Sequence, residues 1–96
     1  MLQQLMITTT DKTTLKPLVE SAIEREKEVL SLAIRRTREQ LAEFEQHYGM
    51  SSAEFERRLN ALELQETVEF TDWRMEIGML RLLENQHQAL REAQVD

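Results

Sequence analysis

Residues 48–55 decide the fold, because they end one helix and begin another; they read Tyr48-Gly49-Met50-Ser51-Ser52-Ala53-Glu54-Phe55. Gly49 suits the left-handed backbone conformation that ends a helix, since it has no Cβ to clash there. Ser51 is a preferred N-cap, and Glu54, three residues later, predicts a capping box. Met50 and Phe55 occupy the two positions of a hydrophobic staple, which fixes the angle between the helices. The stretch therefore predicts a bent helical hairpin instead of one long rod.

The composition around this corner indicates a chain that is nearly all helix. Its 96 residues include only 2 Gly and 1 Pro, with 31% charged and 5% aromatic residues. That profile is typical of long helices and coiled coils. A chain of this length forms one domain near the lower limit for a self-sufficient core. We therefore expect an all-α fold, a long antiparallel helical hairpin with a short corner helix, that dimerises into a bundle.

The first helix is predicted to run from Leu15 to Tyr48. Thr13 or Thr14 is placed to cap it, and Pro17 is tolerated because it falls in the first turn. At about 1.5 Å per residue this helix is about 50 Å long.

The chain before this helix differs from the rest. Residues 5–10 are apolar and β-branched, and a polar turn follows them. Because a lone short strand is not stable in water, the segment either forms a loose arm or pairs as a strand with a second subunit or a partner. We therefore expect an extended or disordered arm over residues 1–14 and a single helical domain over residues 15–96.

The second helix is predicted from about Ser52 to Leu64, with a break at residues 65–67. Its apolar side chains are spaced by four and three residues, as one face of a helix requires; they are Phe55, Leu59 and Leu62.

The third helix is predicted to end at Ala93. It begins either at Val68, with Thr67 as its cap, or at Asp72, with Thr71 as its cap.

Charge and composition argue against several functions. The formal net charge of −6 repels phosphate and disfavours a nucleic-acid partner. The absence of cysteine excludes disulfides and thiolate zinc sites. No apolar run approaches the roughly 20 residues of a membrane span, and the N-terminus lacks the pattern of a secretion signal. We therefore expect a cytoplasmic, non-catalytic protein without a cofactor.

Apolar stripes on the long helices indicate protein contacts. In the first helix the spacings of three and four alternate, as a coiled-coil-like seam requires. The third helix carries two stripes, which indicates one contact inside the subunit and one outside it, although both stripes also fit an ordinary bundle core. We predict a partner or dimer interface formed by Ile34, Leu41, Met75, Met79 and Leu82.

Trp73 near the start of the third helix allows two interpretations. It is either a core anchor that closes the corner or an exposed hot spot for a partner. We take the first interpretation. The predicted structural corner then consists of Phe44, Tyr48, Gly49, Met50, Ser51, Glu54, Phe55 and Trp73.

One catalytic alternative stays open, a ferritin-like di-iron oxidase whose metal site forms on dimerisation. Glu84 and His87 have the Glu-x-x-His spacing, which places a carboxylate and an imidazole on one helix face. If the first and third helices are antiparallel, Glu26 lies level with His87 and supplies a second carboxylate.

The corner also carries a resemblance. Phe44-Glu45-x-x-Tyr48-Gly49-Met50-Ser51-Ser52-x-Glu54-Phe55, followed by Glu69-Phe70-x-Asp72-Trp73, resembles small, mostly uncharacterised prokaryotic helical proteins. Members are often found beside genes for small toxin-like proteins, so the resemblance implies an antitoxin-like partner of a small toxin protein. The likeness covers most of residues 15–85, and its motif specifies architecture more than activity. The chain departs from it between the second and third helices, where it has Leu62-Glu63-Leu64-Gln65-Glu66 in place of a Gly-Glu-Leu and further acids.

Overall fold

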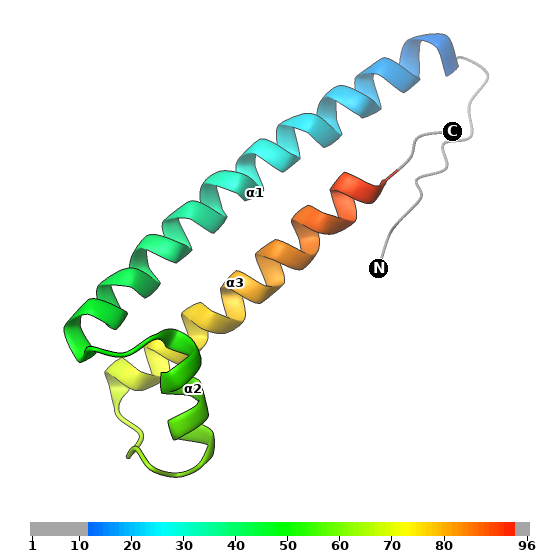
Figure 1. Cartoon of the computed structure of the whole chain (residues 1–96). Helices are drawn as coiled ribbons and strands as arrows, with labels where there is room; N and C mark the ends of the chain where they lie inside the picture. Colours follow the sequence, from blue (N-terminus) through cyan, green and yellow to red (C-terminus); the bar gives the residue numbers. More distant parts are fainter. Residues whose placement is uncertain (1–11, 94–96) are drawn as a thin grey trace.

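The computed structural model describes residues 12–93, which form three helices (Figure 1). Their bounds are Lys12–Tyr48 for α1, Ser52–Asn60 for α2 and Val68–Glu92 for α3. The long helices α1 and α3 lie antiparallel, and the short α2 lies at the corner that joins them. The predicted all-α helical hairpin with a short corner helix is confirmed.

The start of α1 differs from the prediction. The helix begins at Lys12 and not at Leu15, so Thr13 and Thr14 lie inside it and do not cap it. Pro17 consequently falls in the second turn, where its missing N–H leaves the carbonyl of Thr13 without the usual helical donor. The last residues of the predicted arm, 12–14, therefore belong to the helix. The apolar segment of the arm, at residues 5–10, lies outside the described residues.

The corner has the predicted backbone. Gly49 adopts the left-handed conformation with φ 66°, and its N–H donates to the Glu45 carbonyl at 2.9 Å. Ser51 is extended, and its hydroxyl accepts from the N–H of Glu54 at 3.1 Å. The capping box is not completed as predicted, because the Glu54 carboxylate accepts hydrogen bonds from Arg57 and Arg58 instead. The carboxylate of Glu45 caps the helix in addition, accepting from the N–H of Ser52 at 2.7 Å.

The second helix ends four residues earlier than predicted. After Asn60 the N–H of Leu62 donates to the carbonyl of Leu59 at 3.1 Å, and the N–H of Glu63 donates to the carbonyl of Arg58 at 2.9 Å. This pair of bonds is a Schellman motif. Leu62 takes the left-handed position with φ 60° and is 89% exposed, so it does not belong to the apolar face predicted for it.

The third helix begins at the first of the two predicted starts. Thr67 is extended, and its hydroxyl accepts from the N–H of Phe70 at 3.0 Å. Thr71 lies inside the helix, so the alternative start at Asp72 is wrong.

The core is concentrated at the corner. The rings of Phe55 and Trp73 are fully buried and stack 3.9 Å apart with an interplanar angle of 2°. Phe44 and Tyr48 stack on Trp73 from α1 at 5.5 and 5.7 Å. The indole N–H of Trp73 donates to the hydroxyl of Ser52 at 2.9 Å, so its polar atom is satisfied. Trp73 is therefore the predicted core anchor, and the exposed hot-spot interpretation is wrong.

No helix in the described part of the chain is long and apolar enough to cross a membrane.

Candidate protein-binding surface

An apolar stripe on α3 faces away from the core. Met75, Met79 and Leu82 are spaced by four and three residues, which places them along one line of the helix. Their exposed fractions are 66%, 46% and 51%. We call these three residues the outer stripe. They are the members of the predicted interface that are available to another molecule.

For the other two predicted interface residues, the structure corrects the prediction. Ile34 and Leu41 are only 8% and 7% exposed, and they pack inside the hairpin between α1 and α3. The alternating spacing that predicted an interface on α1 describes the seam within one subunit. These residues are core, so a partner does not reach them while the hairpin is folded.

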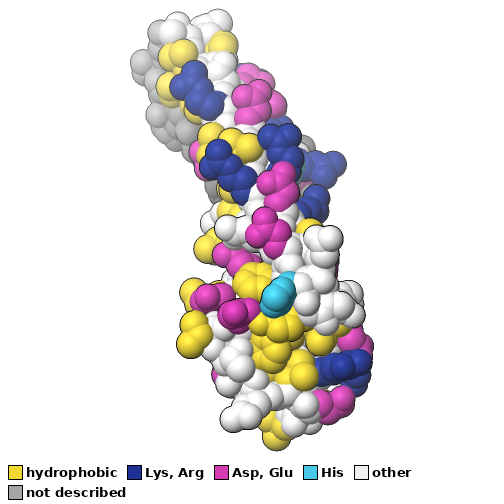
Figure 2. Space-filling model, turned by 90° about the vertical axis from the view of Figure 1, so that its left-hand side faces the viewer, with side chains coloured by type: hydrophobic (Ala, Val, Ile, Leu, Met, Phe, Trp, Pro, Cys, Tyr) yellow, Lys and Arg dark blue, Asp and Glu magenta, His cyan; other side chains and the backbone are white. Residues whose placement is uncertain are grey.

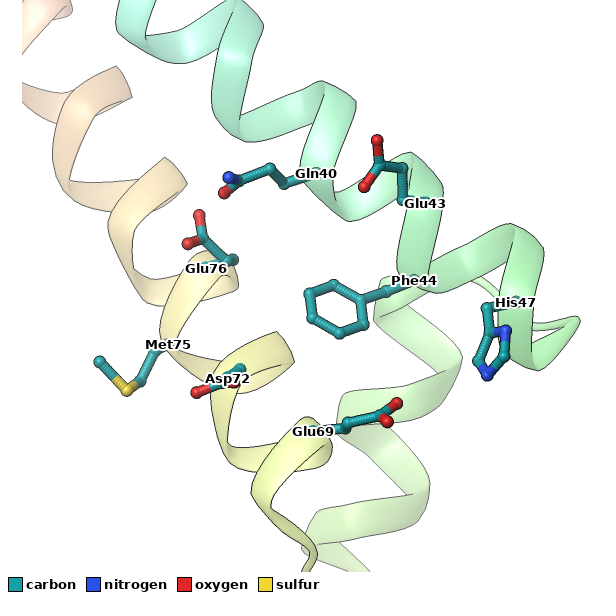
Figure 3. Close-up of a pocket in the computed structure, with 8 residues that line it drawn as sticks. All are labelled: Gln40, Glu43, Phe44, His47, Glu69, Asp72, Met75 and Glu76. Carbon is teal, nitrogen blue, oxygen red and sulfur yellow. The ribbon is translucent and has the colours of Figure 1, made fainter.

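A groove of about 510 Å³ lies beside the outer stripe, between the corner ends of α1 and α3 (Figure 3). Four carboxylates line it, and we call it the acidic groove. The ring of Phe44 lies between the two helices, and Met75 belongs both to the groove and to the outer stripe. The complete lining is Gln40, Glu43, Phe44, His47, Glu69, Asp72, Met75 and Glu76.

Two acids of the groove, Glu69 and Glu76, accept hydrogen bonds from neutral side chains in the described part of the chain. Glu69 accepts a hydrogen bond from the hydroxyl of Tyr48, and this bond is the main cause of the raised pKa of Tyr48, ahead of burial and the Glu69 charge. With its amide nitrogen turned toward Glu76, Gln40 donates to both carboxylate oxygens at 3.0 Å. Among residues 12–93, none of the four carboxylates forms an ion pair with a basic side chain. Their negative charge is thus not neutralised within the described chain.

The acids around α2 are paired, in contrast. Glu56 on α2 binds Arg81 on α3, with one of the two hydrogen bonds at 3.0 Å. Glu54 accepts from Arg57 at 2.8 Å and from Arg58 at 2.9 Å, and these bonds lower its pKa to about 2. Arg81 therefore links α3 to α2, Arg57 and Arg58 pair with Glu54 within α2, and none of these arginines pairs with an acid of the acidic groove.

Charged and hydrophobic side chains lie in different proportions along one face of the molecule. On the face seen in Figure 2, basic side chains gather in the upper half, toward the far end of the hairpin. The lower half presents a hydrophobic area with acidic side chains beside it and a group of basic side chains at one edge.

The residues of the metal alternative do not converge in a single chain. Glu84 accepts a hydrogen bond from Arg38 at 2.6 Å, and His87 shares one with Ser31 at 3.1 Å. Ser31, and not Glu26, lies opposite His87, so Glu26 is displaced by about 7.5 Å along the helix axis. Within the described range, no group of three or more His, Asp or Glu side chains is arranged to hold a metal ion.

Sequence reasoning missed the acidic groove. Its four acids come from two helices and are brought together by the packing register, which the sequence pattern alone does not give. The pairing of Gln40 with Glu76 and of Tyr48 with Glu69 shows that register. A helical projection of both helices, rotated so that Trp73 and Leu41 face inward, places these acids on one side.

No protein-family model matches the chain, and the comparisons with curated proteins and solved structures likewise give no match. The resemblance carried by the corner therefore stays a prediction.

Proposed function

We propose that the protein is non-catalytic and acts by binding another protein, as the antitoxin-like partner of a small toxin protein. The observation that carries this proposal is the outer stripe, a line of three exposed apolar side chains on a helix whose other face is buried. Exposed apolar patches of this kind mark interaction sites on soluble proteins.

The chemistry of the stripe suits a partner surface. Methionine is flexible and polarisable, so Met75 and Met79 adapt to the shape of an apolar helix face. The acidic groove lies directly beside the stripe and is complementary to a basic protein. Such complementarity speeds association, while burial of the apolar stripe supplies affinity. The antitoxin role itself rests on the resemblance at the corner.

Co-expression with the product of the adjacent gene, followed by size-exclusion chromatography, tests the proposal. We expect the two proteins to co-elute and the toxicity of the partner to be relieved. Absence of both co-elution and growth rescue would remove the antitoxin interpretation.

A matched pair of variants shows whether the outer stripe makes the contact. Met75→Glu places a charge in the stripe, and Leu18→Glu does the same at a similarly exposed position on α1, since the two side chains are 66% and 63% exposed. We expect only Met75→Glu to abolish co-elution. Equal behaviour of the two variants would contradict the assignment of the stripe.

A further inference from the structure

We propose that the acidic groove receives an arginine side chain of the partner protein, from a helix whose apolar face lies along the outer stripe. This inference rests on the proposed function, because it takes the occupant to be another protein, and it adds the chemistry by which that protein is recognised.

The first step of the argument is the charge of the groove. Glu43, Glu69, Asp72 and Glu76 form no ion pair within residues 12–93, although arginines elsewhere near the corner pair with other acids. A neutral or acidic occupant would remove water from these carboxylates and give no charge in return, which is costly. A cation offsets that cost, so charge complementarity selects a basic occupant.

The second step is the arrangement of the acids. They approach the groove from two helices, Glu43 from α1 and Asp72 and Glu76 from α3 (Figure 3). A guanidinium group carries five N–H donors in a plane and bonds several carboxylate oxygens at once, whereas an ammonium group is a compact point charge. The ring of Phe44 in the same lining offers a face on which a guanidinium group stacks. The groove therefore suits arginine better than lysine.

The third step is the continuity of the groove with the outer stripe. Asp72 precedes Met75 by three residues and lies on the same side of α3 as Met75 and Met79. From Asp72 to Leu82 the helix rises about 15 Å, which is the length of about ten residues of a second helix. A partner helix along this line contacts the stripe through apolar residues spaced by three and four, with one arginine a turn away at the groove.

A synthetic peptide tests this arrangement. The probe is a blocked, alanine-rich helical peptide with three leucines on one face and a single arginine one turn before the first of them. A second peptide carries citrulline in place of the arginine, which keeps its shape and removes its charge. Binding to the full-length chain is followed by NMR titration and by the fluorescence of Trp73, the only tryptophan, whose ring stacks on Phe44 at 5.5 Å.

The protein variants are chosen as a matched pair. Asp72→Asn with Glu76→Gln neutralises two acids of the groove, and Glu28→Gln with Glu39→Gln neutralises two exposed acids of α1 outside it. Circular dichroism verifies that both variants are folded. We expect the groove variant to bind the arginine peptide about fivefold more weakly or worse, and the α1 variant to change binding by less than about twofold.

The citrulline peptide makes the test specific. It should bind the wild-type chain about fivefold more weakly than the arginine peptide does, and it should bind the groove variant no more weakly than the arginine peptide does. The inference is overturned by an equal loss of binding in the two protein variants, by an equal effect of citrulline on both proteins, or by no binding at about 1 mM peptide.

Three further outcomes separate this inference from others. If the chain without peptide is a dimer that the groove variant dissociates, the occupant is a second copy and the inference is wrong. If the adjacent gene product co-elutes with the chain but the groove variant binds the arginine peptide as tightly as the wild type does, the proposed function stands and the groove assignment fails. If co-elution and growth rescue both fail, the proposed function falls, whatever the peptide does.

Discussion

At the scale of single residues, the backbone conformation requires glycine at one of the two glycine positions and not at the other. Gly49 has φ 66°, whereas Gly78 lies inside α3 in ordinary helical backbone. A Cβ at either position would meet no atom within 4 Å, so the backbone alone decides the effect of a substitution. We expect Gly49→Ala to lower the free energy of unfolding by about 1 kcal/mol. Gly78→Ala should raise it by about 0.5–1 kcal/mol. Urea unfolding of both variants measures the two signs, and a common sign would contradict this account.

Leu62 occupies a position that glycine prefers. With φ 60° and an exposed side chain, it has the strain of the left-handed conformation and almost no packing in return. We expect Leu62→Gly to raise the free energy of unfolding by about 0.5 kcal/mol, after the greater flexibility of glycine in the unfolded chain is subtracted. Leu64→Gly is the control, because Leu64 packs against the core and its loss should destabilise the protein. Destabilisation by both changes in thermal unfolding would show that Leu62 makes a contact in solution.

Leu62 also shows where prediction from sequence ends. The sequence predicts Ser51 as an N-cap, and Thr67 as one of two alternative caps, because serine and threonine accept hydrogen bonds from free helix N–H groups. Nothing in the run Ala61-Leu62-Glu63-Leu64 breaks a helix, so the sequence predicts a helix that continues to Leu64. The chain turns there because Leu64 reaches the aromatic core and α3 returns to α1, and both are tertiary requirements.

Glu54 makes the stability of the folded chain depend on pH. Its hydrogen bonds from Arg57 and Arg58 lower its pKa from 4.5 to about 2 in the folded chain. A carboxylate with a lowered folded pKa adds stability above its unfolded pKa and loses it as the pH falls toward the folded one. We expect stability to decrease between about pH 5 and pH 2, and Glu54→Gln to flatten part of that decrease. Thermal unfolding across this range measures the slope, with Glu39→Gln as the control that leaves it unchanged.

At the scale of the elements, α1 has two unequal parts. Its first buried side chain within residues 13–48 is Leu30, and its first turns extend beyond the end of α3 (Figure 1). Helical segments without buried contacts open more easily than packed ones. We expect backbone amides of residues 15–24 to exchange with deuterium at least about tenfold faster than those of residues 34–48. Equal protection would show that another molecule, such as a second copy, covers this end.

The seam between α1 and α3 shows how far periodicity alone predicts contacts. Apolar spacings of three and four predicted contacts for Ile34, Leu41, Met75 and Met79. Ile34 and Leu41 are buried inside the hairpin, whereas the contact of the exposed Met75 and Met79 with another molecule stays a prediction. The pattern of a seam within one chain is the same as that of a seam between chains. Only the packing of α3 on α1 divides these residues into a buried pair and an exposed pair.

At the scale of the whole molecule, the chain carries its negative charge unevenly. Acids near α2 are neutralised by Arg57, Arg58 and Arg81, whereas those of the acidic groove are not. The net charge of −6 is evident from the composition, but the concentration in one groove of four acids without ion pairs among the described residues is not. That concentration depends on the register of the two long helices, so it appears only in the folded hairpin.

Groove acids without ion pairs in the described part of the chain should make the free chain less stable than a variant in which these acids are neutral. Asp72 and Glu76 are four residues apart on α3, a spacing at which like charges repel by about 0.2–0.5 kcal/mol. We expect Asp72→Asn with Glu76→Gln to raise the free energy of unfolding by about 0.5 kcal/mol while it weakens binding of the arginine peptide. Urea unfolding at low salt measures the first effect, and added salt should shrink it.

The control for this prediction is Glu56→Gln, which removes an acid paired with Arg81 and should lower stability without changing peptide binding. Opposite signs for the changes in the free energy of unfolding of these two variants would show that the groove acids destabilise the fold, while the peptide titration shows that they strengthen binding. A groove variant less stable than the wild type would mean that these acids support the hairpin itself, because their hydrogen bonds within the chain would then outweigh their mutual repulsion.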